Sequence, residues 1–213
     1  MFVLLGGCTK ETPAASEPGP APPPPVVKKT SDRPVIVAFG DSLSAGFGLE
    51  PGQSYPDYLQ QILDKQGYSY RVIPEALSGD TSSGGVARLE LVLAHQPRIV
   101  VLELGANDGL RGIPVSRTRE NLSSMIERFK AAGAKVLLAS IMLPRNYGAA
   151  YTREFDGMYP ELARKHGIPL IPFPADVALN PKLMLPDALH PNAEGNVKVA
   201  ENVFRTLQPL LAR

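Results

Sequence analysis

Several kinds of residue are scarce in this chain, and each shortage excludes a class of protein. The only cysteine is Cys8, so no disulfide can form within the chain and no metal site can be built from several cysteines. Lys and Arg number 22 against 21 Asp and Glu, a formal net charge of +1. Because basic and acidic residues are nearly equal in number, the chain has no large excess of positive charge with which to bind nucleic acid. We expect no nucleic-acid partner, no metal and no cofactor.

Large apolar side chains are also nearly absent from residues 9–33, which are rich in Pro, Ala and Glu. Such a segment cannot build a core, and its proline run favours extended polyproline II structure. The whole chain of 213 residues is nevertheless 44% hydrophobic, which suffices for one domain with a core. We therefore expect a signal remnant at 1–8, a Pro-rich tether at 9–33 and one folded domain at 34–213.

The first eight residues form a short apolar run that ends in Leu5-Gly6-Gly7-Cys8. This stretch resembles the lipobox of bacterial lipoproteins, in which cleavage leaves a lipid-modified cysteine at the new N-terminus. It lacks the basic region and the full apolar region of a secretory signal, and a chance apolar start with a buried cysteine is the alternative. The resemblance implies lipidation of Cys8 and a membrane anchor. Because position 9 is not Asp, it favours a periplasm-facing lipoprotein of the outer membrane.

From residue 34 onward, short apolar runs alternate with helical patterns. Five runs have β-type composition: 34–39, 70–74, 98–104, 134–141 and 168–173. Apolar residues at helical spacing lie between them, as in Leu122, Met125, Ile126 and Phe129, and a capping box at Ser54 and Asp57 begins the first helix. We expect a three-layer α/β/α fold whose five-stranded parallel sheet has the flavodoxin-like order 2-1-3-4-5.

Ligands bind such sheets at the carboxyl ends of the strands, so polar residues there are candidates for a site. The first strand ends in Gly40-Asp41-Ser42, the second leads into residues 76–85, and the third ends in Gly105-Ala106-Asn107-Asp108. These three strands are neighbours in the expected order. An accessible Ser42 hydroxyl among small residues could be a nucleophile, although a capped strand-to-helix turn explains the same residues.

Three histidines occur, and they differ in context. His95 and His166 each end a helical pattern, where a cation suits the helix dipole, so we interpret both as solvated helix C-terminal residues. His190 follows the fifth strand, with Asp187 three positions earlier. On a tight turn that carboxylate can hold the Nδ1–H of the imidazole and leave Nε2 free to accept a proton from a serine. By itself this spacing is weak evidence for catalysis and favours a structural turn.

Four segments together resemble the sequence blocks of the SGNH (GDSL) hydrolases, in order and in spacing. They are GDSLS at 40–44, SGDT at 78–81, GAND at 105–108 and DALHP at 187–191. More narrowly, GDSLSAGFG, ELGANDGLRG and LPRNYG resemble the TesA-like branch of esterases, acyl-thioesterases and lysophospholipases. The resemblance covers residue 34 to the C-terminus, with Ala106 where several relatives have Gly. The G-x-S-x-G elbow of α/β-hydrolases is absent, because Ser44 occupies its second glycine position.

The resemblance implies a serine esterase that works through an acyl-enzyme. Ser42 is then the nucleophile, His190 the base and Asp187 its orienting partner, while an oxyanion hole comes from Ser42, Gly79 and Asn107. We expect Asp41, Asp80 and Asp108 to cap helices or brace turns.

The substrate is expected to be a small acyl ester, thioester or lysophospholipid, bound by a monomer in a shallow groove. By resemblance, the loop at 143–151 corresponds to a mobile loop beside the acyl channel, although an ordinary connection after a strand explains the same residues. From it we select Leu143, Pro144, Asn146 and Tyr147 as substrate-binding residues. A carbohydrate O-acetyl esterase can use the same four blocks. A non-enzymatic binding lipoprotein is the alternative from another class.

Overall fold

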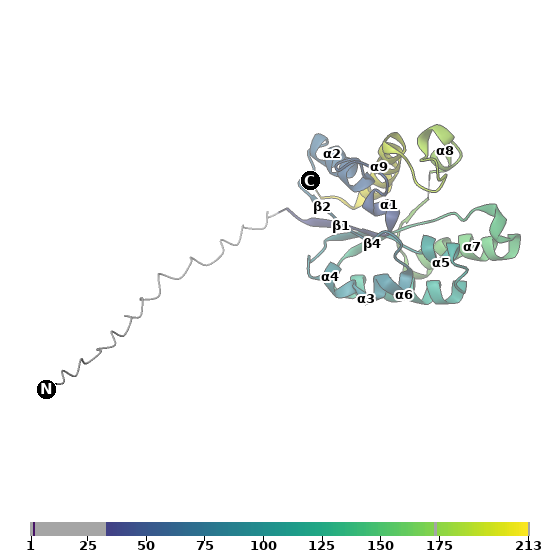
Figure 1. Cartoon of the computed structure of the whole chain (residues 1–213), viewed down its shortest axis with the longest axis horizontal. Helices are drawn as coiled ribbons and strands as arrows, with labels where there is room; N and C mark the ends of the chain where they lie inside the picture. The colour runs from purple at the N-terminus through teal and green to yellow at the C-terminus, as the bar shows by residue number, and fades with distance from the viewer. Residues whose placement is uncertain (1, 3–32, 173, 213) are drawn as a thin grey trace. The chain divides into compact units, whose positions relative to one another are not determined.

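The computed structural model describes residues 2, 33–172 and 174–212. Cys8 and residues 9–32 of the expected tether lie outside the described residues. From residue 33 onward the chain forms one compact unit around a five-stranded sheet (Figure 1). The strands are β1 (Val35–Gly40), β2 (Arg71–Ala76), β3 (Ile99–Glu103), β4 (Lys135–Ala139) and β5 (Leu170–Ile171). All pairs are parallel in the order β2-β1-β3-β4-β5, which confirms the predicted topology.

Helices cover both faces of this sheet, as Figure 1 shows. On one side lie α2 (Tyr55–Lys65) and α9 (Ala193–Leu207), and on the other α3 (Ser82–Ala87), α4 (Leu89–Leu93), α6 (Val115–Ala131) and α7 (Ala149–His166). Short helices occupy the connections: α1 (Ser42–Ala45), α5 (Ala106–Leu110) and α8 (Ala175–Ala178), with 3₁₀ turns at Arg145–Tyr147, Pro181–Leu183 and Gln208–Leu210. In the described part of the chain, no helix combines the length and apolar character needed to cross a membrane.

The core is divided by the sheet, because successive side chains of a strand point to opposite faces. Ile36 and Ala38 of β1 pack with α2 and α9, whereas Val37 and Phe39 pack with α4, α6 and α7. β3 is buried along its whole length. Strands that are apolar on both faces are typical of parallel sheets covered on both sides, as the sequence pattern indicated.

The strand register brings three loop segments to one edge. Gly40, the last residue of β1, pairs with Ala76 of β2 on one side and with Glu103 of β3 on the other. The carboxyl ends of these three strands therefore coincide. The segments that follow them carry Ser42, Gly79 and Asn107, as expected from the strand order.

Helix boundaries differ most from the sequence pattern at residues 82–93. Val86, Leu89, Val92 and Leu93 are spaced as on a single helix, but two short helices meet at Arg88, whose backbone leaves helical geometry with φ −106° and ψ 12°. The first of them contains Gly84 and Gly85, which are poor helix formers. The predicted capping box of α2 is confirmed, because the Ser54 and Asp57 side chains and backbone N–H groups bond reciprocally.

Candidate active site

Ser42 lies just beyond β1, on the first turn of α1. Asp41 caps this helix, since its side chain accepts a hydrogen bond from the Leu43 N–H at 3.2 Å. The helix stops after one turn because Gly46 adopts the left-handed conformation, with φ 70°, and returns its N–H to the Ser42 carbonyl. The Ser42 side chain is thus presented at a helix start, only partly buried.

A chain of hydrogen bonds links Ser42 to the loop before α9. The Ser42 hydroxyl lies 2.8 Å from Nε2 of His190, and Nδ1 of the same ring lies 2.7 Å from Oδ2 of Asp187. These distances match a serine whose proton passes to an imidazole that a carboxylate holds in place. The structure therefore brings together all three residues that the sequence selected, although 148 positions separate Ser42 from His190.

The loop that carries His190 is held by its own backbone. Oδ1 of Asp187 accepts hydrogen bonds from the N–H groups of Leu189 and His190, at 2.9 and 3.0 Å. Ala188, which follows Asp187, has a positive φ of 55°. The turn is closed by a hydrogen bond from the Leu185 N–H to the His190 carbonyl at 2.7 Å. Desolvation raises the pKa of Asp187, but these hydrogen bonds and that from the imidazole outweigh it and lower the pKa below its ordinary value. The carboxylate stays ionised and keeps the imidazole oriented.

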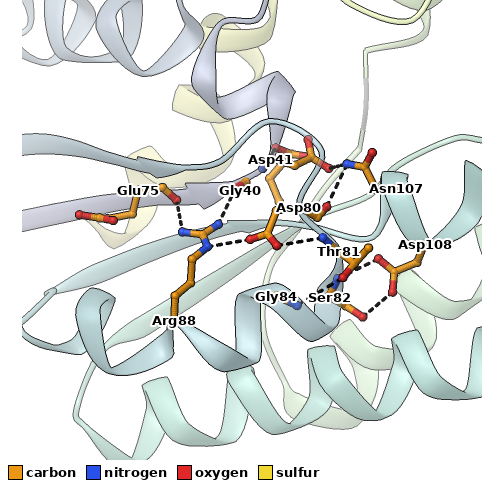
Figure 2. A network of polar contacts seen from close by, with 11 residues as sticks. Gly40, Asp41, Glu75, Asp80, Thr81, Ser82, Gly84, Arg88, Asn107 and Asp108 are labelled. Carbon is orange, nitrogen blue, oxygen red and sulfur yellow. Dashed lines mark hydrogen bonds and ion pairs between the residues drawn. The ribbon is translucent and has the colours of Figure 1, made fainter. Parts of the chain in front are cut away.

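Asn107 occupies α5, beside the nucleophile turn. Its side-chain Nδ2 donates to Oδ2 of Asp41 at 3.1 Å and to the backbone carbonyl of Asp80 at 2.9 Å (Figure 2). Both hydrogens of the amide are therefore directed at acceptors within the protein. The structure places Asn107 beside the nucleophile turn, but the sequence gave no sign of these two partners.

Gly79 lies in the loop after β2 and has a φ of 83°. An L-residue would be strained in this conformation, so glycine is required here. Its carbonyl accepts a hydrogen bond from Nη2 of Arg111 at 2.9 Å, and the next residue, Asp80, contacts Asn107. The backbone of this loop is thus tied to the segment that follows β3.

The acidic residues of the motifs brace turns, as predicted. Oδ1 of Asp80 accepts from the Thr81 N–H at 3.0 Å, and Asp108 accepts from the backbone N–H of Ser82 at 2.8 Å and from its hydroxyl at 2.5 Å. Burial raises the pKa of Asp41 to about 6, even though hydrogen bonds from the Leu43 N–H and from Asn107 lower it. Each carboxylate therefore holds backbone near the site.

A buried glutamate that sequence reasoning missed supports the nucleophile turn from below. Glu103 ends β3, and its Oε2 accepts from the Ser44 hydroxyl at 2.8 Å and from the Asp41 N–H at 3.4 Å. Burial, together with the nearby Asp41 carboxylate, raises the pKa of Glu103 well above its ordinary value. Its other oxygen, Oε1, is buried with no hydrogen-bond partner among the described residues. The sequence signal that could have identified Glu103 is its place as an acidic residue directly after the apolar run Ile-Val-Val-Leu.

A groove of about 320 Å³ opens beside Ser42 and His190. Apolar side chains from separate segments form most of its lining: Leu43, Leu110, Ile141, Met142, Leu143, Pro144, Leu179, Met184 and Leu189. Such a surface accepts a hydrocarbon chain better than a sugar. Leu179 and Met184 come from residues 175–184, which precede the His190 loop and for which the sequence contained no site signal.

The four predicted substrate-binding residues divide into two pairs. Leu143 and Pro144 line the groove, whereas Asn146 and Tyr147 are exposed outside its lining. The Tyr147 hydroxyl donates instead to the carbonyl of Leu110 at 3.1 Å, which ties the 143–151 loop to α5.

The other two histidines have partners away from this groove. Nε2 of His95 lies 2.6 Å from Oε1 of Glu75, and Nε2 of His166 lies 2.8 Å from the Ser123 hydroxyl. His166 is the last residue of α7, as expected; burial and the neighbouring Lys165 lower its pKa. Across the residues that the structure describes, no three His, Cys, Asp or Glu side chains are grouped as metal ligands.

Comparison with known proteins agrees with this geometry. Residues 38–198 match the GDSL-like Lipase/Acylhydrolase family. The chain is 43% identical over 178 residues to the esterase TesA of Pseudomonas aeruginosa, covering 83% of this chain and 89% of that protein. It is 41% identical over 178 residues to thioesterase 1/protease 1/lysophospholipase L1 of Escherichia coli K12, covering 83% and 84%. A crystal structure of TesA superposes with a TM-score of 0.80 at 42% identity, covering 83% of this chain and 99% of that one.

The parallel sheet and the hydrogen-bonded Ser, His and Asp at its carboxyl edge define a serine hydrolase built on an α/β fold. The chain belongs to the GDSL-like lipase/acylhydrolase family. It is an esterase of the SGNH type, so the interpretation as an enzyme is confirmed over that of a non-enzymatic binding lipoprotein.

Proposed function

We propose that this enzyme hydrolyses acyl esters and thioesters through an acyl-enzyme on Ser42. The Ser42 oxygen bonds to the acyl carbon while its proton moves to Nε2 of His190. The leaving alcohol or thiol departs with that proton, and water then releases the acid by the same route in reverse. The supporting observation is the hydrogen-bonded chain from Ser42 through His190 to Asp187.

Three donors would stabilise the negative charge that develops on the carbonyl oxygen. We assign these to the backbone N–H groups of Ser42 and Gly79 and to the side chain of Asn107. Neither N–H group donates to another residue in the described part of the chain. The Asn107 amide would exchange its longer contact, 3.1 Å to Asp41, for the oxyanion and keep the contact to the Asp80 carbonyl.

The substrate class we infer is a medium-length acyl chain on an alcohol, thiol or lysophospholipid. The apolar groove beside Ser42 supports an acyl chain over the carbohydrate O-acetyl group of the alternative function. The names of the two relatives, an esterase and a thioesterase/lysophospholipase, point the same way.

Covalent labelling tests the assignment of the nucleophile directly. A fluorophosphonate should add to Ser42, and Ser42→Ala should lose both labelling and activity while it keeps its melting temperature. Ser44→Ala is not a suitable control because Glu103 binds that hydroxyl, so Ser83→Ala, an exposed serine on α3, serves instead. Labelling at another serine would overturn the assignment. A panel of p-nitrophenyl esters, acyl-CoAs and lysophospholipids then ranks the substrates.

We further propose that Cys8 carries a lipid that anchors the protein in the outer membrane, facing the periplasm, with residues 9–33 as the tether. The support is the sequence Leu5-Gly6-Gly7-Cys8 and the proline-rich composition that follows it. Labelled palmitate should be incorporated into the wild-type protein in a bacterial host and not into Cys8→Ser. Mass spectrometry that finds unmodified Cys8 in the mature protein would contradict the anchor. For the catalytic unit itself we propose a monomer, which size-exclusion chromatography with light scattering tests.

A further inference from the structure

Arg88 lies at the junction of α3 and α4. Its side chain points into the protein, toward the ends of the neighbouring strands (Figure 2). Its side chain is only 15% exposed, and that of its ionic partner Asp80 is 8% exposed. The guanidinium also lies over the ring of Phe39, 4.4 Å from the ring centroid. A buried charge of this kind is costly unless every donor is used.

The guanidinium donates to three acceptors from three segments. Nε bonds to Oδ2 of Asp80 at 2.7 Å, Nη1 to the carbonyl of Glu75 at 3.0 Å, and Nη2 to the carbonyl of Gly40 at 2.8 Å. Glu75 and Gly40 lie at the carboxyl ends of neighbouring strands β2 and β1. One planar group therefore joins two strand ends to the loop after β2.

Two of these acceptors, Gly40 and Asp80, lie close in sequence to donors of the proposed oxyanion hole. Gly40 stands two residues before Ser42. Asp80 follows Gly79 directly, and its carbonyl accepts the hydrogen bond from Asn107. The three donors come from three different strand ends, so their relative positions depend on the groups that join those ends. Arg88 contacts the ends of β1 and β2 directly, and it reaches the segment after β3 through Asp80, whose carbonyl binds Asn107.

The neighbouring sequence makes room for this arrangement. A Cβ on Gly84 would lie 1.7 Å from Oδ1 of Asp80, so only glycine leaves space for the carboxylate that receives Arg88. Lysine could not replace the arginine, because one ammonium on a flexible stem cannot reach three acceptors spread around a plane.

We propose that Arg88 is a positioning residue that sets the spacing of the oxyanion-hole donors at Ser42, Gly79 and Asn107. It touches neither substrate nor reacting atoms and acts through Gly40 and Asp80. The inference rests on the proposed acyl-enzyme mechanism and adds a residue to it. A displacement of about 1 Å between donors and oxyanion weakens bonds that form fully only in the transition state, so the effect falls on kcat.

The test compares Arg88→Lys with the wild type and with a matched control, Arg119→Lys. The ion pair of Arg119 with Glu161 joins α6 to α7. Active-site titration with a fluorophosphonate counts folded, competent sites, so kcat is expressed per titrated site. Arg88→Lys should lower kcat by roughly tenfold to a hundredfold, with KM within about threefold, and weaken binding of an alkyl boronic acid by a similar factor. Arg119→Lys should leave all three unchanged.

A purely structural role predicts a different result. The melting temperature of Arg88→Lys would then fall while kcat per titrated site and boronic acid affinity stay at the wild-type values, and this outcome would overturn the proposal. If Arg88→Lys does not fold, Asp80→Asn removes the charge that receives the guanidinium, and it should show the same kcat-selective loss at a smaller size. Failure of the fluorophosphonate to label wild-type Ser42 would instead refute the proposed function, which separates the two hypotheses.

Discussion

The two halves of the catalytic arrangement are built in opposite ways. The turn that presents Ser42 is held by buried groups, since its own Asp41 and Ser44 are 0% exposed and Glu103 of β3, which binds both, is 5% exposed. The loop that presents His190 is held by hydrogen bonds within residues 185–190, and the Asp187 side chain is 34% exposed. Changes in the loop should therefore alter chemistry with little effect on stability, whereas changes beneath the nucleophile turn should alter both.

The largest effect is expected in the exposed loop. Asp187→Asn should lower kcat by about 10⁴-fold, because an amide cannot stabilise the imidazolium and favours the wrong tautomer. Its melting temperature should stay within about 2 °C of the wild type, since the loop is local and exposed. Asp176→Asn, an exposed aspartate on α8, is the control and should change neither. A normal kcat in Asp187→Asn would exclude its catalytic role.

Asn107 tests whether a residue between the two regions acts on the transition state. Asn107→Ala should cut kcat by about 10² to 10³, some 3 to 4 kcal/mol, with KM nearly unchanged. It should also lower the stability by about 1 kcal/mol, because the hydrogen bonds to Asp41 and to the Asp80 carbonyl are lost. Kinetics and thermal unfolding on one preparation separate the two effects. A kcat within threefold of the wild type would remove Asn107 from the oxyanion hole.

For the buried acids of the nucleophile turn, Asp41 and Glu103, we expect the free energy of unfolding to depend on pH. The raised pKa values of Asp41 and Glu103 mean that, above about pH 4, the folded state keeps protons that the unfolded chain releases. These groups therefore favour the fold most at low pH, and their contribution declines as pH rises from about 4 through their folded-state pKa values.

Glu103→Gln should flatten this decline, so that its free energy of unfolding gains on that of the wild type as the pH rises from 4 to 8. Urea unfolding at several pH values measures the difference, with the exposed Glu120→Gln as control. A constant difference across this range would mean that Glu103 is not protonated in the fold.

The smallest effect is expected outside the groove. Asn146→Ala should leave kcat and KM within about twofold, because Asn146 is exposed and does not line the groove. Leu143→Ala is the matched variant on the same loop, and it should alter the preference for acyl-chain length because its side chain forms the groove wall. A large rise in KM for Asn146→Ala would restore this residue to the substrate site.

The sequence predicted best those features that depend on local pattern. The apolar runs identified the five strands, and the motif residues Ser42, Asp187 and His190 lie where a strand end and a tight turn place them. Arg88 and Glu103 were missed for a physical reason. In sequence each is one charged residue, and only the packing of other strands around it shows that its charge is buried. The sequence predicted a groove but not that Leu179 and Met184 line it, because nothing in residues 175–184 marks these side chains as facing Ser42.

The distance in sequence between Ser42 and His190 has a consequence for the timing of activity. The hydrogen bond between them closes only when α9 has packed on α2, where Asn196 bridges the Tyr55 N–H and the Pro191 carbonyl. Contacts so far apart in a chain form late in folding, because the intervening loop must first be closed. A growing or partly folded chain therefore holds its nucleophile without its base. Ester hydrolysis therefore requires both the end of β1 and the loop before α9 to be in place, so the enzyme's own turnover reports that these two distant segments have come together.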